Sequence, residues 1–308
     1  MMEKQRNTFV SKNGKTKVNY YEWSNGEKPK AILQIAHGVT EYAERYTELA
    51  EYLSDKGIMV IANDHIGHGY SQNEDGSNKM CFGEEGSWIY PVEDIVFLSK
   101  KYMEMYPDVP FYIMGFSLGS FLVRTALINH PELEYSGTII AGTGQQNNLA
   151  LSIAGFVAKS EARKFGDDAF TPTIENLTFG TYNKYFKPNK TKADWLCENK
   201  EELDKYLKDP LIGEGFTAGL FREMIAGMKY TAKQKNINKM NINIPVMFIS
   251  GKQDPVGEFT KGVKRAEKAF NRAGMRTKSH FVEGRHDIFH EKDVEKVYQL
   301  IYQFVLEM

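Results

Sequence analysis

The sequence predicts an α/β fold, in which a mostly parallel sheet is covered by helices on both faces. Two observations predict it. Short apolar runs typical of buried strands alternate with segments that repeat apolar residues at helical spacing. The alternation stops over residues 145–235, where aromatic-rich helical patterns follow one another without a strand, and then resumes. Because strands that alternate with helices pair in parallel with both faces covered, the alternating parts predict one sheet and the interruption predicts an insertion.

An opening hairpin precedes the alternating strands and helices. It is predicted over residues 7–24, where two strand-like runs flank an Asn13-Gly14 turn. The strands predicted after it are 31–36, 57–62, 111–115, 137–142, 244–250 and 276–282. The predicted helices are 43–55, 91–106, a segment from Ser117 to Asn129, 258–273 and 293–306. This order places the hairpin at one edge of the sheet.

The insertion is expected to form a helical cap over the core. The core comprises residues 1–144 and 236–308, and the cap comprises residues 145–235, which are too many for a simple connection. We expect the cap to cover the carboxyl ends of the strands, where such sheets bind ligands. Its apolar residues at helical spacing include Ile153, Phe156, Val157, Phe216, Leu220, Phe221, Met224, Ile225 and Met228. Most of them should pack the cap onto the core, and some should line a substrate pocket.

The composition is that of an ordinary soluble globular protein. The chain has 308 residues, of which 42% are hydrophobic and 26% charged, and its net charge of −1 gives no support for nucleic-acid binding. Cys81 and Cys197 lie far apart and fit no disulfide or metal-binding spacing. Residues 1–7 lack the apolar core of a signal peptide, and no apolar run reaches the ~18 residues of a membrane-spanning helix. We therefore expect a cytoplasmic protein.

A candidate nucleophile lies where a predicted strand meets a predicted helix. Gly115-Phe116-Ser117-Leu118-Gly119 is a G-x-S-x-G sequence, which in a strand-turn-helix context is typical of a nucleophile elbow. The turn is so sharp that Ser117 takes a strained conformation and neighbouring side chains would collide, which explains the two glycines. The alternative is an ordinary serine in a glycine-rich turn.

A serine hydroxyl becomes an effective nucleophile only beside a base, and His286 is the predicted base. It follows the last predicted strand and so returns to the sheet edge that carries Ser117. The base in turn needs a carboxylate to orient it, and Asp254 follows the strand 244–250. Serine, aspartate and histidine in this chain order are characteristic of α/β-hydrolases. The rival carboxylates are Asp287, Glu283 and Glu258, and the histidines expected to be structural or solvated are His130, His280 and His290.

The oxyanion of the tetrahedral intermediate needs hydrogen-bond donors. The backbone N–H of Leu118, directly after the nucleophile, is one predicted donor. The second is the N–H of Val39, in the loop after strand 31–36, where His37 and Gly38 shape the turn. Gly38 is also a candidate substrate-binding residue of this loop.

Four segments together resemble the monoacylglycerol lipase and lysophospholipase family of α/β-hydrolases, which is also labelled serine aminopeptidase S33. They are His37–Glu41, Asp64–Ser71, Gly115–Gly119 and Asp254–Gly257, and Asp209–Leu211 resembles part of the cap in such proteins. The resemblance implies an α/β-hydrolase fold and a serine hydrolase. His65 and His68 could suggest a metal site, but no third ligand is apparent and the three reactive residues need no metal, so we expect no metal or cofactor. The resemblance also implies that Asp64–Ser71 braces the oxyanion loop, and we expect Glu41 to hydrogen-bond in the same region.

The expected activity is hydrolysis of carboxylic esters through an acyl-enzyme on Ser117. Monoacylglycerols or lysophospholipids are the expected small-molecule substrates, with a transient contact between the cap and a lipid surface. An aminopeptidase is one alternative, and it would need acidic cap residues to bind an α-amino group; Glu161, Glu175 and Glu214 leave it open. A non-catalytic binding protein of the same fold is the other. The sequence predicts no oligomeric state.

Overall fold

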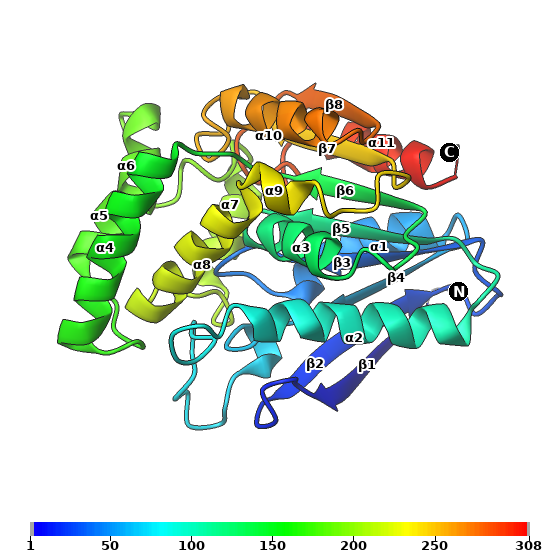
Figure 1. Cartoon of the computed structure of the whole chain (residues 1–308), viewed down its shortest axis with the longest axis horizontal. Helices are drawn as coiled ribbons and strands as arrows, with labels where there is room; N and C mark the ends of the chain where they lie inside the picture. The colour runs from blue at the N-terminus through cyan, green and yellow to red at the C-terminus, as the bar shows by residue number, and fades with distance from the viewer. Residues whose placement is uncertain (1–2, 307–308) are drawn as a thin grey trace.

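The computed structural model describes residues 3–306, which contain one eight-stranded sheet (Figure 1). Its strand order is β1-β2-β4-β3-β5-β6-β7-β8. The β1–β2 and β2–β4 pairs are antiparallel and all other pairs are parallel. The strands are β1 (Glu3–Val10), β2 (Lys17–Ser24), β3 (Ala31–Ala36), β4 (Ile58–Asn63), β5 (Phe111–Phe116), β6 (Gly137–Ala141), β7 (Val246–Gly251) and β8 (Thr277–Val282). The predicted sheet and its opening hairpin are therefore confirmed.

Helices cover both faces of the sheet, so the side chains of one strand enter two separate apolar layers. On β3, for example, Ile32 packs in the layer with α2, α3 and α10, whereas Leu33 packs in the layer with α1 and α11. The helices outside the insertion are η1 (Ala43–Tyr46), α1 (Thr47–Ser54), η2 (Gly69–Ser71), α2 (Ile89–Met105), α3 (Leu118–Asn129), α10 (Lys261–Arg272) and α11 (Val294–Leu306). Continuous apolar strands with buried residues on both faces are what a parallel sheet requires.

The segment between β6 and β7 is helical and lies beyond the carboxyl ends of the parallel strands (Figure 1). Its helices are α4 (Asn148–Phe165), α5 (Pro172–Leu177), α6 (Phe179–Asn183), η3 (Lys184–Phe186), α7 (Lys200–Lys208), α8 (Ala218–Thr231) and α9 (Gln234–Ile237). Asn147, Thr171, Asn199 and Thr217 each cap a helix by accepting a backbone N–H, which fixes where four of these helices begin. Helix α8 packs on α3 of the core, and α4 packs on α8. The predicted cap, residues 145–235, lies within this segment, and its exact boundaries stay a prediction.

One local expectation differs from the structure near the carboxyl end. Helix α10 begins at Lys261 rather than at residue 258, because Glu258, Phe259 and Thr260 have φ angles of 51°, 52° and 77°. These left-handed conformations are incompatible with a helix start. Helix α11 begins at Val294, within one residue of the predicted start, and His290 lies in the turn before it.

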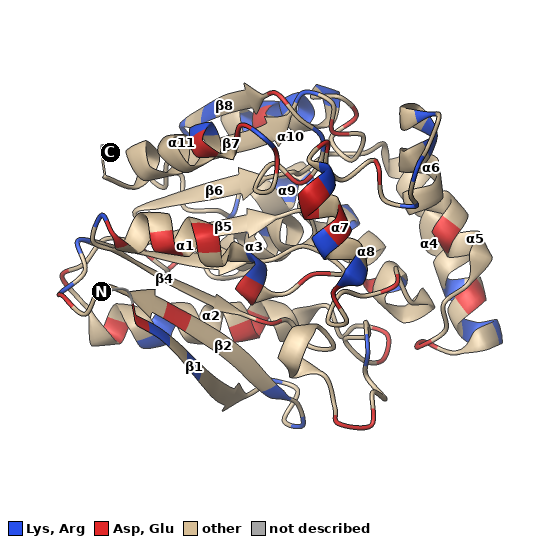
Figure 2. Cartoon of the chain, turned by 180° about the vertical axis from the view of Figure 1, so that it is seen from behind, with Lys and Arg blue, Asp and Glu red and all other residues tan. Residues whose placement is uncertain are grey.

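Acidic and basic residues are mixed on the side of the molecule opposite to that of Figure 1. Seen from behind, acidic and basic residues are interspersed along the helices and loops (Figure 2). Among residues 3–306, no helix is both long enough and apolar enough to cross a membrane.

Candidate active site

Ser117 occupies a strained turn between β5 and α3. Its φ and ψ angles are 51° and −115°, and its backbone N–H donates to the carbonyl of Ala141 over 3.0 Å. A Cβ atom on Gly115 would lie 2.4 Å from the carbonyl oxygen of Gly119, and one on Gly119 would lie 2.0 Å from that of Ala36. Both glycines are therefore required by close backbone contacts. The second contact also brings the elbow against the loop that follows β3.

Three loops at the carboxyl ends of strands bring Ser117, His286 and Asp254 together. The Oγ of Ser117 lies 2.9 Å from Nε2 of His286, and Nδ1 of His286 lies 2.9 Å from Oδ1 of Asp254. Because an ionised carboxylate only accepts hydrogen bonds, Nδ1 carries the hydrogen and Nε2 accepts from the serine hydroxyl. All three side chains are buried, and the ring centroid of His286 lies 4.9 Å from that of Phe116 and 5.2 Å from that of Trp195. This arrangement can activate a serine hydroxyl.

Asp254 is held in place by its own loop. Its Oδ1 accepts the backbone N–H of Val256 at 2.8 Å, and its Oδ2 accepts the hydroxyl of Ser250 at 3.2 Å. The three rival carboxylates are engaged elsewhere. Asp287 pairs with Arg45, Glu283 pairs with Lys252 at the surface, and Glu258 pairs with Arg265. None of these rivals is a hydrogen-bond partner of the imidazole of His286 in the described chain.

The loop after β3 reaches the same place from the other side. Leu118 is the first residue of α3, so its N–H has no acceptor within the helix. In residues 3–306, no oxygen accepts the N–H of Val39 either, and Val39 lines the cavities that Ser117 lines. The N–H of Gly38 instead points away, donating to Oε1 of Glu41 over 2.5 Å. The two predicted oxyanion donors are thus unoccupied N–H groups beside the hydroxyl.

A buried ionic network supports this loop. Glu41 accepts hydrogen bonds from Gly38 and from the hydroxyl of Tyr46, and Arg45 bridges Glu41 and Asp287. Burial and the charge of Asp287 raise the pKa of Glu41, and Arg45 opposes that rise. Burial also disfavours ionisation of Asp287, but His290 and Arg45 hold its pKa below the ordinary value. The network therefore connects the oxyanion loop to the residue that follows His286.

The loop after β4 braces the loop after β3 through three buried histidines. The backbone N–H of His65 donates to Nε2 of His37 over 2.9 Å, and the two rings stack with their centroids 3.9 Å apart. Asp64 accepts the backbone N–H groups of Ala43 and Tyr70. Burial lowers the pKa of His65 to about 3 and that of His68 to about 4, which keeps both rings neutral. No group of three or more metal-binding side chains among residues 3–306 could hold a metal ion.

An apolar cavity of about 170 Å³ opens above Ser117. Core residues Val39 and Val256 line its floor, and the helical segment supplies most of the remaining wall. The lining side chains from that segment are Ala150, Leu151, Ala154, Leu177, Thr178, Phe179, Tyr182, Trp195, Phe216, Phe221, Met224, Ile225 and Met228. None of the residues around this cavity is acidic or basic. It is suited to an apolar chain attached to a carbonyl carbon at Ser117.

The sequence profile of the Hydrolase_4 family, described as serine aminopeptidase, S33, matches residues 27–293. The chain belongs to the S33 family. This match includes β3 to β8, the helical segment and all three of Ser117, Asp254 and His286.

Individual relatives of the S33 chain are named as lipases and esterases. A monoglyceride lipase homologue of monkeypox virus is 28% identical over 240 residues, which are 77% of this chain and 75% of that protein. The mouse monoglyceride lipase is 27% identical over 62% of this chain and 55% of its own length, so the chain spans about half of it. A solved carboxyl esterase from Bacillus coagulans, in complex with glycerol, is 26% identical with a TM-score of 0.89, covering 99% of this chain and 98% of the esterase.

These findings confirm the predicted α/β-hydrolase fold, the family and an enzyme that hydrolyses esters. The individual roles of Ser117, Asp254, His286, Val39 and Leu118 stay predictions, although the structure brings these residues together. Sequence reasoning missed three aromatic cavity residues, Phe179, Tyr182 and Trp195. Phe179 and Tyr182 lie in the short helix α6 and Trp195 lies in a loop, so none of them belongs to a long helical pattern. The one available signal was that tryptophan is a rare residue in this sequence.

Proposed function

We propose that this S33 protein hydrolyses acyl esters of glycerol, with monoacylglycerols and lysophospholipids as its substrate class, through an acyl-enzyme on Ser117. The observation that supports this most strongly is the 2.9 Å contact between Ser117 Oγ and His286 Nε2 beneath an apolar cavity. The names of the relatives, monoglyceride lipases, support the monoacylglycerol part of this substrate class. The fold alone would not, since one fold serves many reactions.

In the proposed reaction, Ser117 Oγ attacks the ester carbonyl carbon while His286 Nε2 takes the hydroxyl proton. The carbonyl oxygen becomes an oxyanion, which the N–H groups of Val39 and Leu118 stabilise. The bond to the leaving alcohol then breaks, and the alcohol oxygen takes the proton from His286. Water repeats the sequence on the acyl-enzyme, releasing the fatty acid and restoring Ser117. Asp254 stabilises the imidazolium that forms twice in this cycle.

The acyl-side cavity favours an ester substrate over an aminopeptidase substrate. In an aminopeptidase substrate, only the Cα atom separates the α-amino nitrogen from the scissile carbonyl carbon. A protein carboxylate that binds this amino group would therefore have to line the cavity above Ser117. No acidic side chain does so among the described residues. Glu175 and Glu214 line a different cavity, and Glu161 lies on α4 away from either cavity lining. A non-catalytic role is disfavoured because all three reactive side chains are present and in contact.

We also propose that residues 145–235 act as a cap and that its outer face contacts lipid surfaces. Exposed apolar side chains on α4 support this contact. The cytoplasm is the proposed location, which is compatible with the free, buried thiols of Cys81 and Cys197.

A fluorophosphonate probe and a series of esters test the proposed function together. The probe should label wild-type protein at Ser117, and Ser117→Ala should abolish both labelling and hydrolysis. On p-nitrophenyl esters from C2 to C16 below their micelle-forming concentrations, kcat/KM should climb to at least C8. Each buried CH₂ contributes about 0.8 kcal/mol, or roughly a three- to fourfold gain. A profile that is flat beyond C4, or hydrolysis only of aminoacyl anilides, would contradict an acyl pocket.

A further inference from the structure

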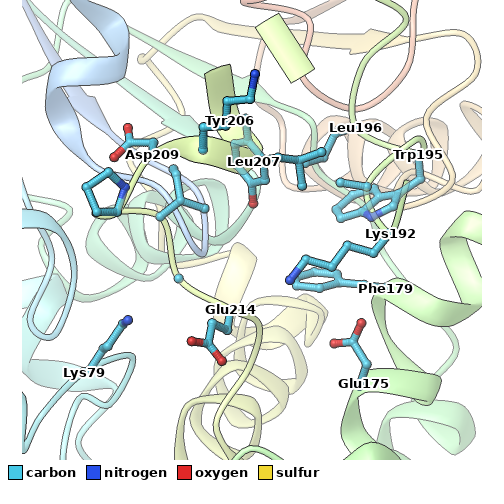
Figure 3. Close-up of a pocket in the computed structure, with 15 residues that line it drawn as sticks. Lys79, Glu175, Phe179, Lys192, Trp195, Leu196, Tyr206, Leu207, Asp209 and Glu214 are labelled. Carbon is cyan, nitrogen blue, oxygen red and sulfur yellow. The ribbon is translucent and has the colours of Figure 1, made fainter. Parts of the chain in front are cut away.

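A second cavity, which we call the polar cavity, lies beside the site and has a different character. Its volume is about 290 Å³, and Lys79, Glu175, Lys192 and Glu214 are among its lining residues. They come from four separate segments: the loop before α2, helix α5, the loop before α7 and the loop before α8. In Figure 3, Lys79, Glu214 and Glu175 are drawn along one side of the polar cavity, with Tyr206, Leu196 and Trp195 along the opposite side.

The polar cavity adjoins the side of the site from which an alcohol must leave. The leaving alcohol takes its proton from His286, so it lies in the cleft that both Ser117 and His286 line. The acyl cavity is lined by Ser117 but not by His286. Trp195, Leu196 and Tyr206 border both the cleft and the polar cavity. A group attached to the leaving alcohol can therefore reach the polar cavity past Leu196 and Tyr206, which line the cleft and the polar cavity but not the acyl cavity.

The charged groups of the polar cavity have few partners within the protein. Among residues 3–306, no ion pair and no side-chain hydrogen bond is formed by four of its charged side chains, those of Lys79, Lys192, Glu175 and Glu214. Asp209, another lining carboxylate, is by contrast engaged by the hydroxyl of Tyr42. Lys208 also lines the polar cavity and likewise has no ion pair among the described residues. Three cations and two anions thus surround one cavity with their hydrogen-bonding capacity available to a bound group.

Aromatic rings add a surface for a cation. Phe179 and Trp195 line the polar cavity and stack on each other with centroids 5.1 Å apart. Aromatic faces attract ammonium groups, and carboxylates nearby add to that attraction. Burial raises the pKa of Glu175, and the charge of Lys192 opposes the rise.

We propose that the polar cavity is a subsite for a zwitterionic phosphodiester head group carried by the alcohol portion of the ester. The lysine side chains of the polar cavity hold the phosphate, and Glu175 and Glu214 hold the amine. The proposal rests on the proposed function, because it assumes that an alcohol leaves from Ser117. It assigns the protein to lysophospholipids with an aminoalcohol head group in preference to neutral monoacylglycerols.

The test compares four substrates that share an octanoyl chain and differ in the alcohol portion. They are monooctanoylglycerol, octanoyl lysophosphatidic acid, octanoylcholine and octanoyl lysophosphatidylethanolamine, which are neutral, anionic, cationic and zwitterionic. We expect the zwitterionic ester to have the highest kcat/KM, about tenfold above the neutral one, since several charge pairs each contribute a few-fold. An equal or lower value for the zwitterionic ester than for the neutral one overturns the proposal, as does a higher value for the anionic or the cationic ester.

Charge-removing variants test which residues carry the preference. Lys192→Gln and Glu214→Gln should each lower the ratio of zwitterionic to neutral kcat/KM about three- to fivefold. Lys190→Gln and Glu201→Gln are the matched controls, because these exposed side chains line neither cavity. Equal effects of the cavity variants and their controls overturn the proposal.

Direct binding separates failure of this subsite from failure of the proposed function. Glycerophosphoethanolamine, the product without its acyl chain, should bind wild-type protein in calorimetric titration and bind Lys192→Gln more weakly. Binding without any ester hydrolysis would reject the proposed function and retain the subsite. Hydrolysis of monooctanoylglycerol without binding would reject the subsite and retain the proposed function.

Discussion

The strand-end loops and the walls of the acyl cavity, which the helical segment between β6 and β7 supplies, meet at Ser117 but are built from different contacts. In the loops, polar side chains are buried and bonded: Asp64 and Glu41 each accept several hydrogen bonds from neighbouring segments. In the helical segment, the walls of the acyl cavity are apolar side chains, and α8 packs on α3 through apolar contacts. Hydrogen bonds also join this segment to the core, as where Glu223 of α8 accepts the backbone N–H groups of Gly86 and Trp88. On its outer side, α4 exposes Leu149, Ile153 and Phe156 to solvent.

This difference places the control of catalysis in the loops and the control of substrate preference in the helical segment. Buried hydrogen bonds are directional and are costly to leave unmade, so the loops hold the reacting groups in one geometry. Apolar packing tolerates exchange of similar side chains at small cost, so the walls of the acyl cavity can change without disturbing Ser117. We therefore expect changes in the loops to alter kcat and changes in the helical segment to alter the preference for substrates.

The largest expected effect comes from Asp254→Asn. The amide would favour the wrong tautomer of His286, and kcat on an octanoyl ester should fall by as much as ~10⁴. Thermal unfolding measured beside the kinetics separates this loss from unfolding. Glu283→Gln, which removes an exposed carboxylate, serves as the control and should leave kcat unchanged. A loss below about tenfold would mean that another carboxylate orients the base.

A smaller effect is expected from Glu41→Gln, which perturbs the oxyanion loop without touching the reacting atoms. Glutamine keeps an oxygen for the N–H of Gly38 but loses the charge that pairs with Arg45. Complete removal of an oxyanion donor lowers kcat about 10²–10³-fold. Glu41→Gln should only displace such a donor, so we expect kcat to fall about tenfold. KM should change little, because the acyl cavity is intact.

Glu44→Gln is the matched control for that variant, since Glu44 lies on the same segment and pairs with Lys4 near the surface. If Glu41→Gln lowers the unfolding temperature but leaves kcat unchanged, Glu41 has a structural role alone.

The same contrast explains what the sequence could predict. The residues Ser117, Asp254 and His286 could be placed because each follows a recognisable strand, and parallel strands end at one edge of the sheet. Helical spacing within residues 145–235 predicted helices but not which face points inward. Ile153 and Phe156 look like pocket residues in the sequence, yet they are 61% and 77% exposed. Leu151 and Ala154, from the same helix, line the cavity instead. Only packing against α8 decides which face of α4 is buried.

The polar cavity was beyond sequence prediction for a related reason. Lys79, Glu175, Lys192 and Glu214 are separated by up to 135 residues, as 214 − 79 shows, and each one looks like an ordinary surface charge. No short-range pattern marks charges that meet only through the arrangement of several loops.

The smallest expected effect concerns the outer face of α4. Leu149, Ile153 and Phe156 follow helical spacing and are 69%, 61% and 77% exposed, while the opposite face of the helix lines the acyl cavity. Such a row can insert shallowly into a lipid surface next to the cavity that receives the acyl chain. Phe156→Ser should therefore lower hydrolysis of monoacylglycerol presented in phosphatidylcholine vesicles about three- to tenfold, because part of a buried phenylalanine side chain's ~1.5–3 kcal/mol is lost.

Hydrolysis of a monomeric butanoyl ester by Phe156→Ser should stay within about twofold of wild type, since the side chain lines neither cavity. Val10→Ser, which removes a 67%-exposed apolar side chain from β1, is the control for a general loss of surface hydrophobicity. Vesicle co-sedimentation should follow the same order, with Phe156→Ser below Val10→Ser. Equal activity of the two variants on vesicles would show that α4 does not contact lipid. The exposed apolar residues of α4 would then have no part in lipid contact. They would be present only because packing of the helical segment places little constraint on that outer face.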